Sequence, residues 1–182
     1  MRSDEWALRL LVLTTALGLS TCVCAEPSQG ETLYQHCKTC HGVDGQGGKG
    51  GKYPRIAALP KDYISKQLNA FKTRKRINKP MIPLFKDWRF NADAMAAVAE
   101  YVAGLPEPAV EFLFPEPSPE ALADFDSRDE YDELGAELFQ STCAQCHGKD
   151  GRGKAEKESP PLVNQYPAYV RKQIEDFIAG RR

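Results

Sequence analysis

Hydrophobic and polar positions follow helical spacing in several short segments of the chain. Residues 61–72 place apolar side chains three and four positions apart, and an alanine-rich stretch over 91–104 opens on Asn91 and ends on Gly104. This spacing is typical of amphipathic helices, with Asn as the amino-terminal cap and Gly as the stop signal. A further helical segment is expected over 31–40, and no segment shows the sustained alternation of a strand. The sequence therefore predicts an all-α protein of short helices joined by loops rich in glycine and proline.

The longest apolar run lies near the N-terminus, over 8–19, after Arg2 and before a group of small residues. This is the layout of a secretory signal peptide, and the run is too short to span a bilayer comfortably. We expect cleavage after Ala25, with an uncleaved anchor helix and lipid attachment at Cys22 as the alternatives. Export makes the periplasm the expected location and leaves peripheral association with a membrane open.

One eleven-residue pattern occurs twice in the chain. CKTCHGVDGQG begins at Cys37, and CAQCHGKDGRG begins at Cys143, 106 positions later. The same shift, without a gap, aligns YISKQLNAF over 63–71 with YVRKQIEDF over 169–177. An internal match of this length indicates one domain design used twice. We expect a signal peptide over 1–25, a first domain over 26–104, an acidic linker rich in Pro and Glu over 105–128, and a second domain over 129–182.

The formal net charge of -1 gives no reason to expect nucleic-acid binding, but it conceals a strong asymmetry. Residues 38–89 hold thirteen Lys and Arg against three Asp, whereas residues 105–140 hold eleven acidic residues and one Arg. The basic run over 72–79 precedes Met81 and is a candidate for steering an acidic redox partner. A solvated surface without that role is the alternative.

The C-x-x-C-H pattern of both copies is the attachment sequence for a c-type haem. Each thiol adds to a vinyl group, and the histidine that follows ligates the iron. Two disulfides are the ordinary expectation for four cysteines in an exported chain, but they leave the adjacent histidines unexplained. A zinc site would bring two such pairs closer in sequence, and a thioredoxin-like pair would follow a strand. We therefore expect two covalent haems attached through Cys37, Cys40, Cys143 and Cys146, with His41 and His147 as iron ligands.

A methionine is the expected second axial ligand of the first haem, because a thioether stabilises ferrous iron in electron-carrying cytochromes. Met81 lies between two prolines in a predicted loop that could cross to the far face of the haem from His41. Packing against the haem edge is the alternative for Met81. Met95 has core spacing on its predicted helix. His36, which Thr142 replaces in the second copy, is expected to face solvent.

Together these features resemble the periplasmic dihaem cytochrome c4 family. The resemblance rests on the two C-x-x-C-H-G-x-D-G-x-G motifs, the Y-(I/V)-x-K-Q-(L/I) helix and the loop methionine, and it covers the chain from about residue 30. It implies two tandem class I cytochrome c domains, each a few short helices around a covalent haem, packed about a pseudo-twofold axis.

The resemblance further implies a carrier of electrons between respiratory-chain donors, a quinol-oxidising complex or periplasmic dehydrogenases and a terminal oxidase. Its partners would be redox proteins, and no small-molecule substrate is expected. The alternative is a haem-containing subunit or domain of a redox enzyme, of the dihaem peroxidase or thiosulfate-oxidising dehydrogenase type. A haem sensor is a third class.

The second copy departs from the family pattern at its far end. The position that matches Met81 would be 187, whereas the sequence ends at Arg182. We expect the complete gene product to extend past Arg182, with a methionine at or near 187. A five-coordinate second haem that binds ligands is the alternative.

Overall fold

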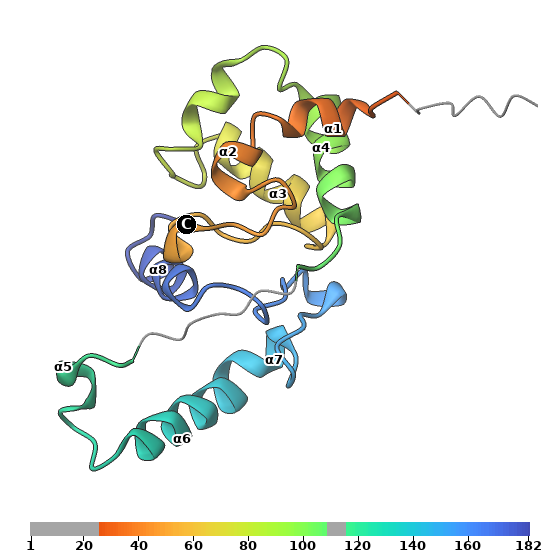
Figure 1. Cartoon of the computed structure of the whole chain (residues 1–182). Coiled ribbons are helices and arrows are strands. Elements are labelled where there is room, and N and C mark those ends of the chain that lie inside the picture. Colours follow the sequence, from red (N-terminus) through yellow and green to blue (C-terminus); the bar gives the residue numbers. More distant parts are fainter. Residues whose placement is uncertain (1–25, 109–115) are drawn as a thin grey trace, which may run out of the picture.

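The computed structural model describes residues 26–108 and 116–182, referred to below as the first and second units. The predicted signal peptide over 1–25, including Cys22, lies outside these residues. The described residues are helical, with long connecting loops (Figure 1) and only two isolated bridges in place of strands. The all-α prediction is confirmed.

The first unit begins with a capped helix and continues through the first C-x-x-C-H motif. The Ser28 hydroxyl accepts a hydrogen bond from the Glu31 amide at 3.1 Å and so caps the first helix. The segment expected to be helical over 31–40 contains two helices separated by a turn. The elements of this unit are α1 (Gln29–Tyr34), α2 (Lys38–His41), the 3₁₀ turn η1 (Lys49–Gly51), α3 (Lys61–Lys72), the 3₁₀ turn η2 (Ile82–Lys86) and α4 (Ala92–Gly104).

Helix α4 organises the hydrophobic core of the first unit. The Asn91 side chain caps it by accepting from the Ala94 amide at 2.9 Å, as the sequence predicts. The helix packs on both α1 and α3. The contact with α1 is so close that a Cβ on Gly30 would lie 2.2 Å from the Ala97 carbonyl oxygen. The apolar side chains that meet between these helices are buried: Leu33, Ile64, Leu68, Ala94, Met95, Val98, Ala99 and Val102.

The second unit repeats the order of the motif and of the helix that follows it. Its elements are α5 (Pro119–Leu122), α6 (Arg128–Leu138), a π-helical turn η3 (Phe139–Cys143), α7 (Ala144–His147), the 3₁₀ turn η4 (Ala155–Lys157) and α8 (Pro167–Ile178). Helix α5 lies within the segment expected to be an acidic linker, 105–128. Helix α8 corresponds to α3 under the 106-residue shift.

The π-helical turn marks a one-residue difference between the two copies. The Leu-aromatic pair before the motif is Leu33–Tyr34 in the first unit and Leu138–Phe139 in the second, a shift of 105 positions. From the motif cysteines onward the shift is 106. A π-helical turn accommodates one extra residue within a helix, and the helix before α7 has this form over its last turn.

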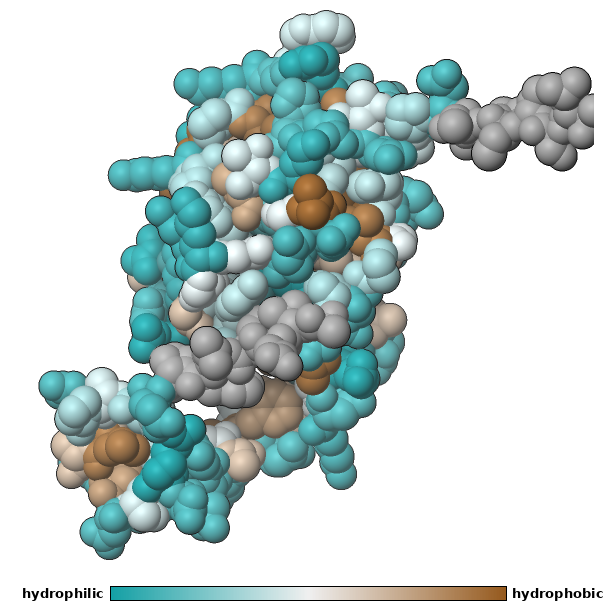
Figure 2. Space-filling view, viewed as in Figure 1, coloured by the Kyte–Doolittle hydropathy of each residue, from teal (hydrophilic) through white to brown (hydrophobic). Residues whose placement is uncertain are grey.

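The two units contact each other through their loops and through η1 and α8. The Gln165 side chain donates to the Arg55 carbonyl at 2.9 Å and accepts from the Arg55 amide at 3.0 Å. Helix α6 projects away from these contacts (Figure 1), and hydrophobic side chains are exposed on the lobe formed by α5 and α6 (Figure 2). None of the described helices is both long enough and apolar enough to cross a bilayer.

Candidate haem sites

The two C-x-x-C-H motifs form short helical turns with nearly the same backbone. Cys37 has φ −91° and ψ −35°, and Cys143 has φ −88° and ψ −37°. Each turn ends on a glycine with φ +82°, a conformation that favours glycine over other residues. The four cysteines of these turns, Cys37, Cys40, Cys143 and Cys146, are free thiols. The structure therefore brings both thiols and the histidine of each motif to one short turn, and it forms neither of the disulfides that four cysteines could make.

The two motif histidines are held in the same orientation. Nδ1 of His41 lies 2.9 Å from the Pro54 carbonyl oxygen, and Nδ1 of His147 lies 2.9 Å from the Pro160 carbonyl oxygen. A carbonyl can only accept, so Nδ1 must carry the proton in both rings. This tautomer leaves the Nε2 lone pair available to a metal, which is how a second hydrogen bond fixes a ligating histidine.

A glycine in each copy allows the proline loop to reach the histidine. The Gly47 amide donates to the His41 carbonyl at 2.7 Å, and the Gly153 amide donates to the His147 carbonyl at 2.7 Å. A Cβ would lie 2.6 Å from the Tyr53 carbonyl oxygen at Gly47, and as close to the backbone at Gly153. The third glycine of the motif is therefore required for the packing that orients the imidazole.

Burial sets the protonation of the first motif. It raises the pKa of the Cys37 thiol to about 11, and Cys40 adds to the shift. It also lowers the pKa of His41, an effect that the hydrogen bond to Pro54 opposes. At neutral pH the thiol is protonated and the imidazole is neutral. Within the described residues, no group of three or more His, Cys, Asp or Glu side chains converges as a structural zinc site would require.

Both motifs open into one continuous cavity of about 670 Å³, which is within the size range of cofactor sites. Its walls are largely apolar and come from α3 and α8, while Cys37 and His41 of one motif and Cys143 and His147 of the other lie at its surface. The cavity thus combines thioether-forming thiols, an imidazole with a free nitrogen and an apolar lining in each unit. These residues fit a covalently attached haem in both units.

The structure distinguishes between the two methionines of the first unit. Met81 lines the cavity at the start of η2, whereas Met95 is buried in the core between α1, α3 and α4. The core position expected for Met95 is confirmed. His36 is exposed, as expected, and packs its ring edge-on against Phe90 outside the cavity lining.

Sequence reasoning missed one group of residues in the cavity wall. The basic run over 72–79 was expected to be exposed, but Arg76 is buried, with only 7% of its surface accessible. Its guanidinium contacts Tyr169 and Gln173 of the second unit. The sequence signal for this contact was the match of Arg76 to Arg182 under the 106-residue shift. Both arginines contact Gln67 and Gln173.

Comparisons with known proteins agree with this geometry. The cytochrome c family model matches residues 27–106 and 133–182. A "Thiosulfate dehydrogenase electron acceptor" of Thiomonas intermedia is 32% identical over 80% of this chain and 64% of its own length, and one of Stutzerimonas stutzeri is 28% identical over 100% and 83%. The chain thus spans less than two thirds of the length of the first of these relatives. Cytochrome c4 of Pseudomonas aeruginosa is 27% identical over 94% of this chain and 81% of its own length.

Solved structures show the same fold. Reduced cytochrome c4 from Pseudomonas stutzeri matches with a TM-score of 0.66 and 23% identity, covering 87% of this chain and 83% of that chain. Thiosulfate dehydrogenase from Marichromatium purpuratum matches with a TM-score of 0.63 and 27% identity, covering 85% of this chain but 33% of that chain. The expected fold of two tandem class I domains is confirmed. The chain therefore belongs to the cytochrome c family, as a dihaem, cytochrome c4-like electron-transfer protein with covalently bound c-type haems.

Proposed function

We propose that this protein is a periplasmic carrier that accepts electrons from a dehydrogenase and delivers them to a terminal oxidase. The observation that carries the proposal is the shared cavity, because both C-x-x-C-H turns open into it with their histidines in the same orientation. Two redox centres in one cavity allow an electron to enter at one unit and leave from the other. A quinol-oxidising complex is an alternative electron donor to the dehydrogenase.

The proposed ligand sets follow from the cavity lining. Cys37 and Cys40 would attach the first haem, and His41 and Met81 would ligate its iron. Cys143, Cys146 and His147 would hold the second haem. Haem iron supplies reversible one-electron chemistry when it is bound. The protein's own contribution is to fix both imidazoles through Pro54 and Pro160, to present a thioether at Met81 and to exclude water with the apolar side chains of α3 and α8.

The periplasmic location and the domain boundaries are part of the proposal. Residues 1–25 would direct export and then be removed, and the haems would be attached to the C-x-x-C-H motifs of the exported chain. The two proposed domains, 26–104 and 129–182, each contain one motif and the helix that follows it. The acidic segment over 105–128 would connect them.

The donor we favour is a thiosulfate-oxidising dehydrogenase, because two relatives are named as electron acceptors of such an enzyme. The test mixes the oxidised holoprotein anaerobically with a catalytic amount of purified thiosulfate dehydrogenase and thiosulfate. We expect the haem absorption bands to change to those of the reduced form. A mixture without enzyme is the control and should stay oxidised. If the full mixture also stays oxidised while the enzyme reduces another acceptor, the proposed donor is wrong.

One observation favours the second candidate, a haem-containing module of a redox enzyme. The chain matches only 33% of the Marichromatium purpuratum thiosulfate dehydrogenase chain, so a similar fold occurs as part of a longer enzyme. Catalysis at iron requires an open or displaceable coordination position. A carrier with a closed first haem should bind cyanide and carbon monoxide slowly at that haem. Rapid binding there, together with thiosulfate oxidation by the protein alone, would favour the enzyme.

A further inference from the structure

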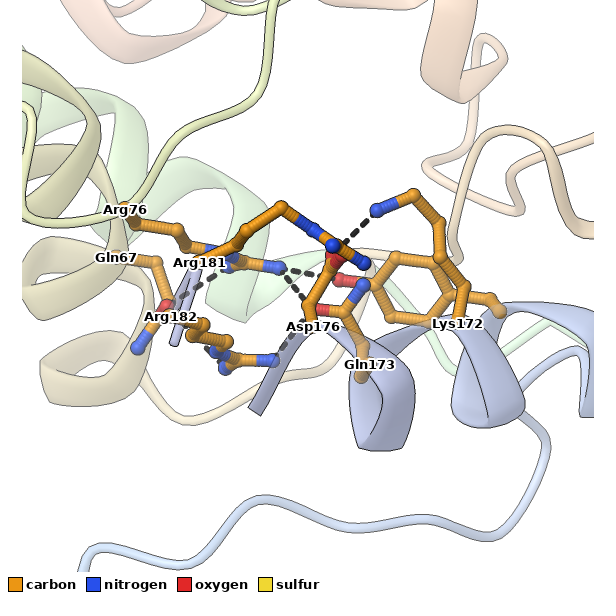
Figure 3. Close-up of polar contacts among 8 residues, drawn as sticks. Gln67, Arg76, Lys172, Gln173, Asp176, Arg181 and Arg182 are labelled. Carbon is orange, nitrogen blue, oxygen red and sulfur yellow. Dashed lines mark hydrogen bonds and ion pairs between the residues drawn. The ribbon is translucent and has the colours of Figure 1, made fainter. Parts of the chain in front are cut away.

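Two arginines, one from each unit, meet in a single hydrogen-bonded cluster between the units (Figure 3). Arg76 donates to Gln67 of its own unit at 2.8 Å, and it reaches Gln173 at 2.6 Å and the Tyr169 hydroxyl at 2.8 Å in the second unit. We name this group the arginine cluster, and its members are Tyr63, Gln67, Arg76, Tyr169, Gln173 and Arg182.

The other half of the arginine cluster repeats these contacts with the units exchanged. Arg182 donates to Gln173 of its own unit at 2.6 Å, to the Tyr63 hydroxyl at 2.8 Å and to Gln67 at 3.3 Å. Each guanidinium also stacks on an aromatic ring of its own unit, Arg76 on Phe71 at 4.5 Å and Arg182 on Phe177 at 4.7 Å. The 106-residue shift maps each of these residues onto its counterpart. The cluster is therefore a pseudo-twofold site that neither unit can form alone.

The arginine cluster has positive charge without a matching anion. None of the ion pairs among the described residues includes Arg76 or Arg182. The carboxylate nearby is Asp176, and it already pairs with Lys172 and Arg181 (Figure 3). Two guanidinium groups that share the same glutamine oxygens repel each other unless an anion offsets their charge.

The arginine cluster also has an unused donor. Gln173 is 92% buried; its Oε1 accepts from both arginines, and its Nε2 has no hydrogen-bond partner. A buried donor left unpaired is unfavourable. All six cluster side chains line the cavity into which His41 and His147 open. The cluster thus presents two cations and a free amide N–H to the space that the two cofactors fill.

The anionic groups of a haem are its propionate carboxylates. Resting on the dihaem assignment, we propose that the arginine cluster is a shared carboxylate-binding site that raises the reduction potentials of both haems. Reduction adds a negative charge to each centre, and nearby fixed cations favour the reduced form. Because each guanidinium contacts both units, loss of either arginine lowers both potentials, and the two haems behave as one electrostatically coupled pair.

The test is a redox titration of the holoprotein, followed by visible absorption, for a series of substitutions at Arg76. Arg76→Gln removes the charge, and Arg76→Lys keeps the charge but loses the planar fork. We expect Arg76→Gln to lower the reduction equilibrium constant of each haem about tenfold, which is about 59 mV for one electron. We expect Arg76→Lys to lie between Arg76→Gln and the wild type. Arg74→Gln is the matched control, since Arg74 is exposed and outside the cavity lining, and it should move neither potential.

Gln173→Glu keeps the proposal falsifiable if Arg76→Gln loses haem. This substitution preserves side-chain size and adds a negative charge at the cluster, so both potentials should fall. A shift confined to one haem, or potentials that match those of Arg74→Gln, would overturn the proposal. The donor is tested with the wild-type protein, without any of these variants, so failure of this inference and failure of the proposed donor are separate outcomes.

Discussion

The two haem units of this protein share a motif and differ in how their helices are covered. Leu68 and Phe71 on α3 are each 7% exposed, whereas the matching Ile174 and Phe177 on α8 are 54% and 57% exposed. The difference arises because α4 packs on α1 and α3 in the first unit, while no described residue takes the place of α4 against α8. The haem-attachment turn is thus formed locally, and burial of the surrounding helix depends on a separate element.

The haem-attachment turns are nevertheless alike in their local geometry. Both histidines bond to a proline carbonyl thirteen residues later at 2.9 Å, and both motif glycines keep positive φ. The eleven motif residues and the proline loop are therefore sufficient to form each turn. Substitutions in the motifs should therefore act equally in the two units, and substitutions in the helices should not.

The largest expected effect is on cofactor content. Replacing Cys37 and Cys40 together by alanine should remove one haem and leave the other attached, and replacing Cys143 and Cys146 should remove the other. The reason is that each pair of thiols lies on its own turn, and no thiol of one motif can serve the other. Intact-protein mass spectrometry and haem quantification after acid-acetone extraction provide the measurement. Loss of both haems from either double variant would show that the units do not mature independently.

A smaller effect should appear in stability. Leu68→Ala removes a buried side chain between α3 and α4 and should lower the free energy of unfolding by about 2–5 kcal/mol. Ile174→Ala, at the matching position on α8, should cost roughly 1 kcal/mol or less, because that side chain is half exposed. Chemical denaturation of the two holoproteins, followed by circular dichroism, measures both. Equal losses would mean that the second haem or another element covers Ile174 in the holoprotein, because this side chain lines the shared cavity.

The smallest effect concerns the charges on the two units. The first unit carries the basic run over 72–79, and Arg74 and Lys79 are two of its exposed residues. Reversing both charges to Glu should slow association with an acidic redox partner about tenfold at low salt, and the loss should shrink as ionic strength rises. Lys149→Glu in the second unit is the control. Stopped-flow rates that do not depend on salt in the wild type would rule out steering.

Local sequence signals predicted the elements that rest on nearby residues. Helix α3 matches the expected range 61–72, and α4 follows the Asn91 cap, because side-chain spacing and capping act within a few residues. The spacing of the C-x-x-C-H motif likewise predicted the turn that joins thiols and imidazole. Haem attachment could be predicted because its chemistry requires those residue types at that spacing.

Contacts between the units could not be predicted in the same way. Arg76 lies in a run that looks solvated, and it is buried only because Tyr169 and Gln173 of the other unit surround its guanidinium. The π-helical turn over Phe139–Cys143 was visible only as a change in shift from 105 to 106 residues. Such features depend on packing between segments about a hundred residues apart, for which a single sequence carries little signal.

The most direct test of the proposed ligand set of the first haem is a redox titration of Met81→Ala beside Met95→Leu. The wild-type holoprotein should show two one-electron steps. Met81→Ala should move one step to lower potential and leave the other in place, because the Met81 thioether would favour ferrous iron at the first haem and its loss changes no charge near the second. Met95→Leu changes a core methionine outside the cavity lining and should move neither step. If Met81→Ala leaves both steps unchanged, Met81 is not an iron ligand, and the proposed ligand set of the first haem is wrong.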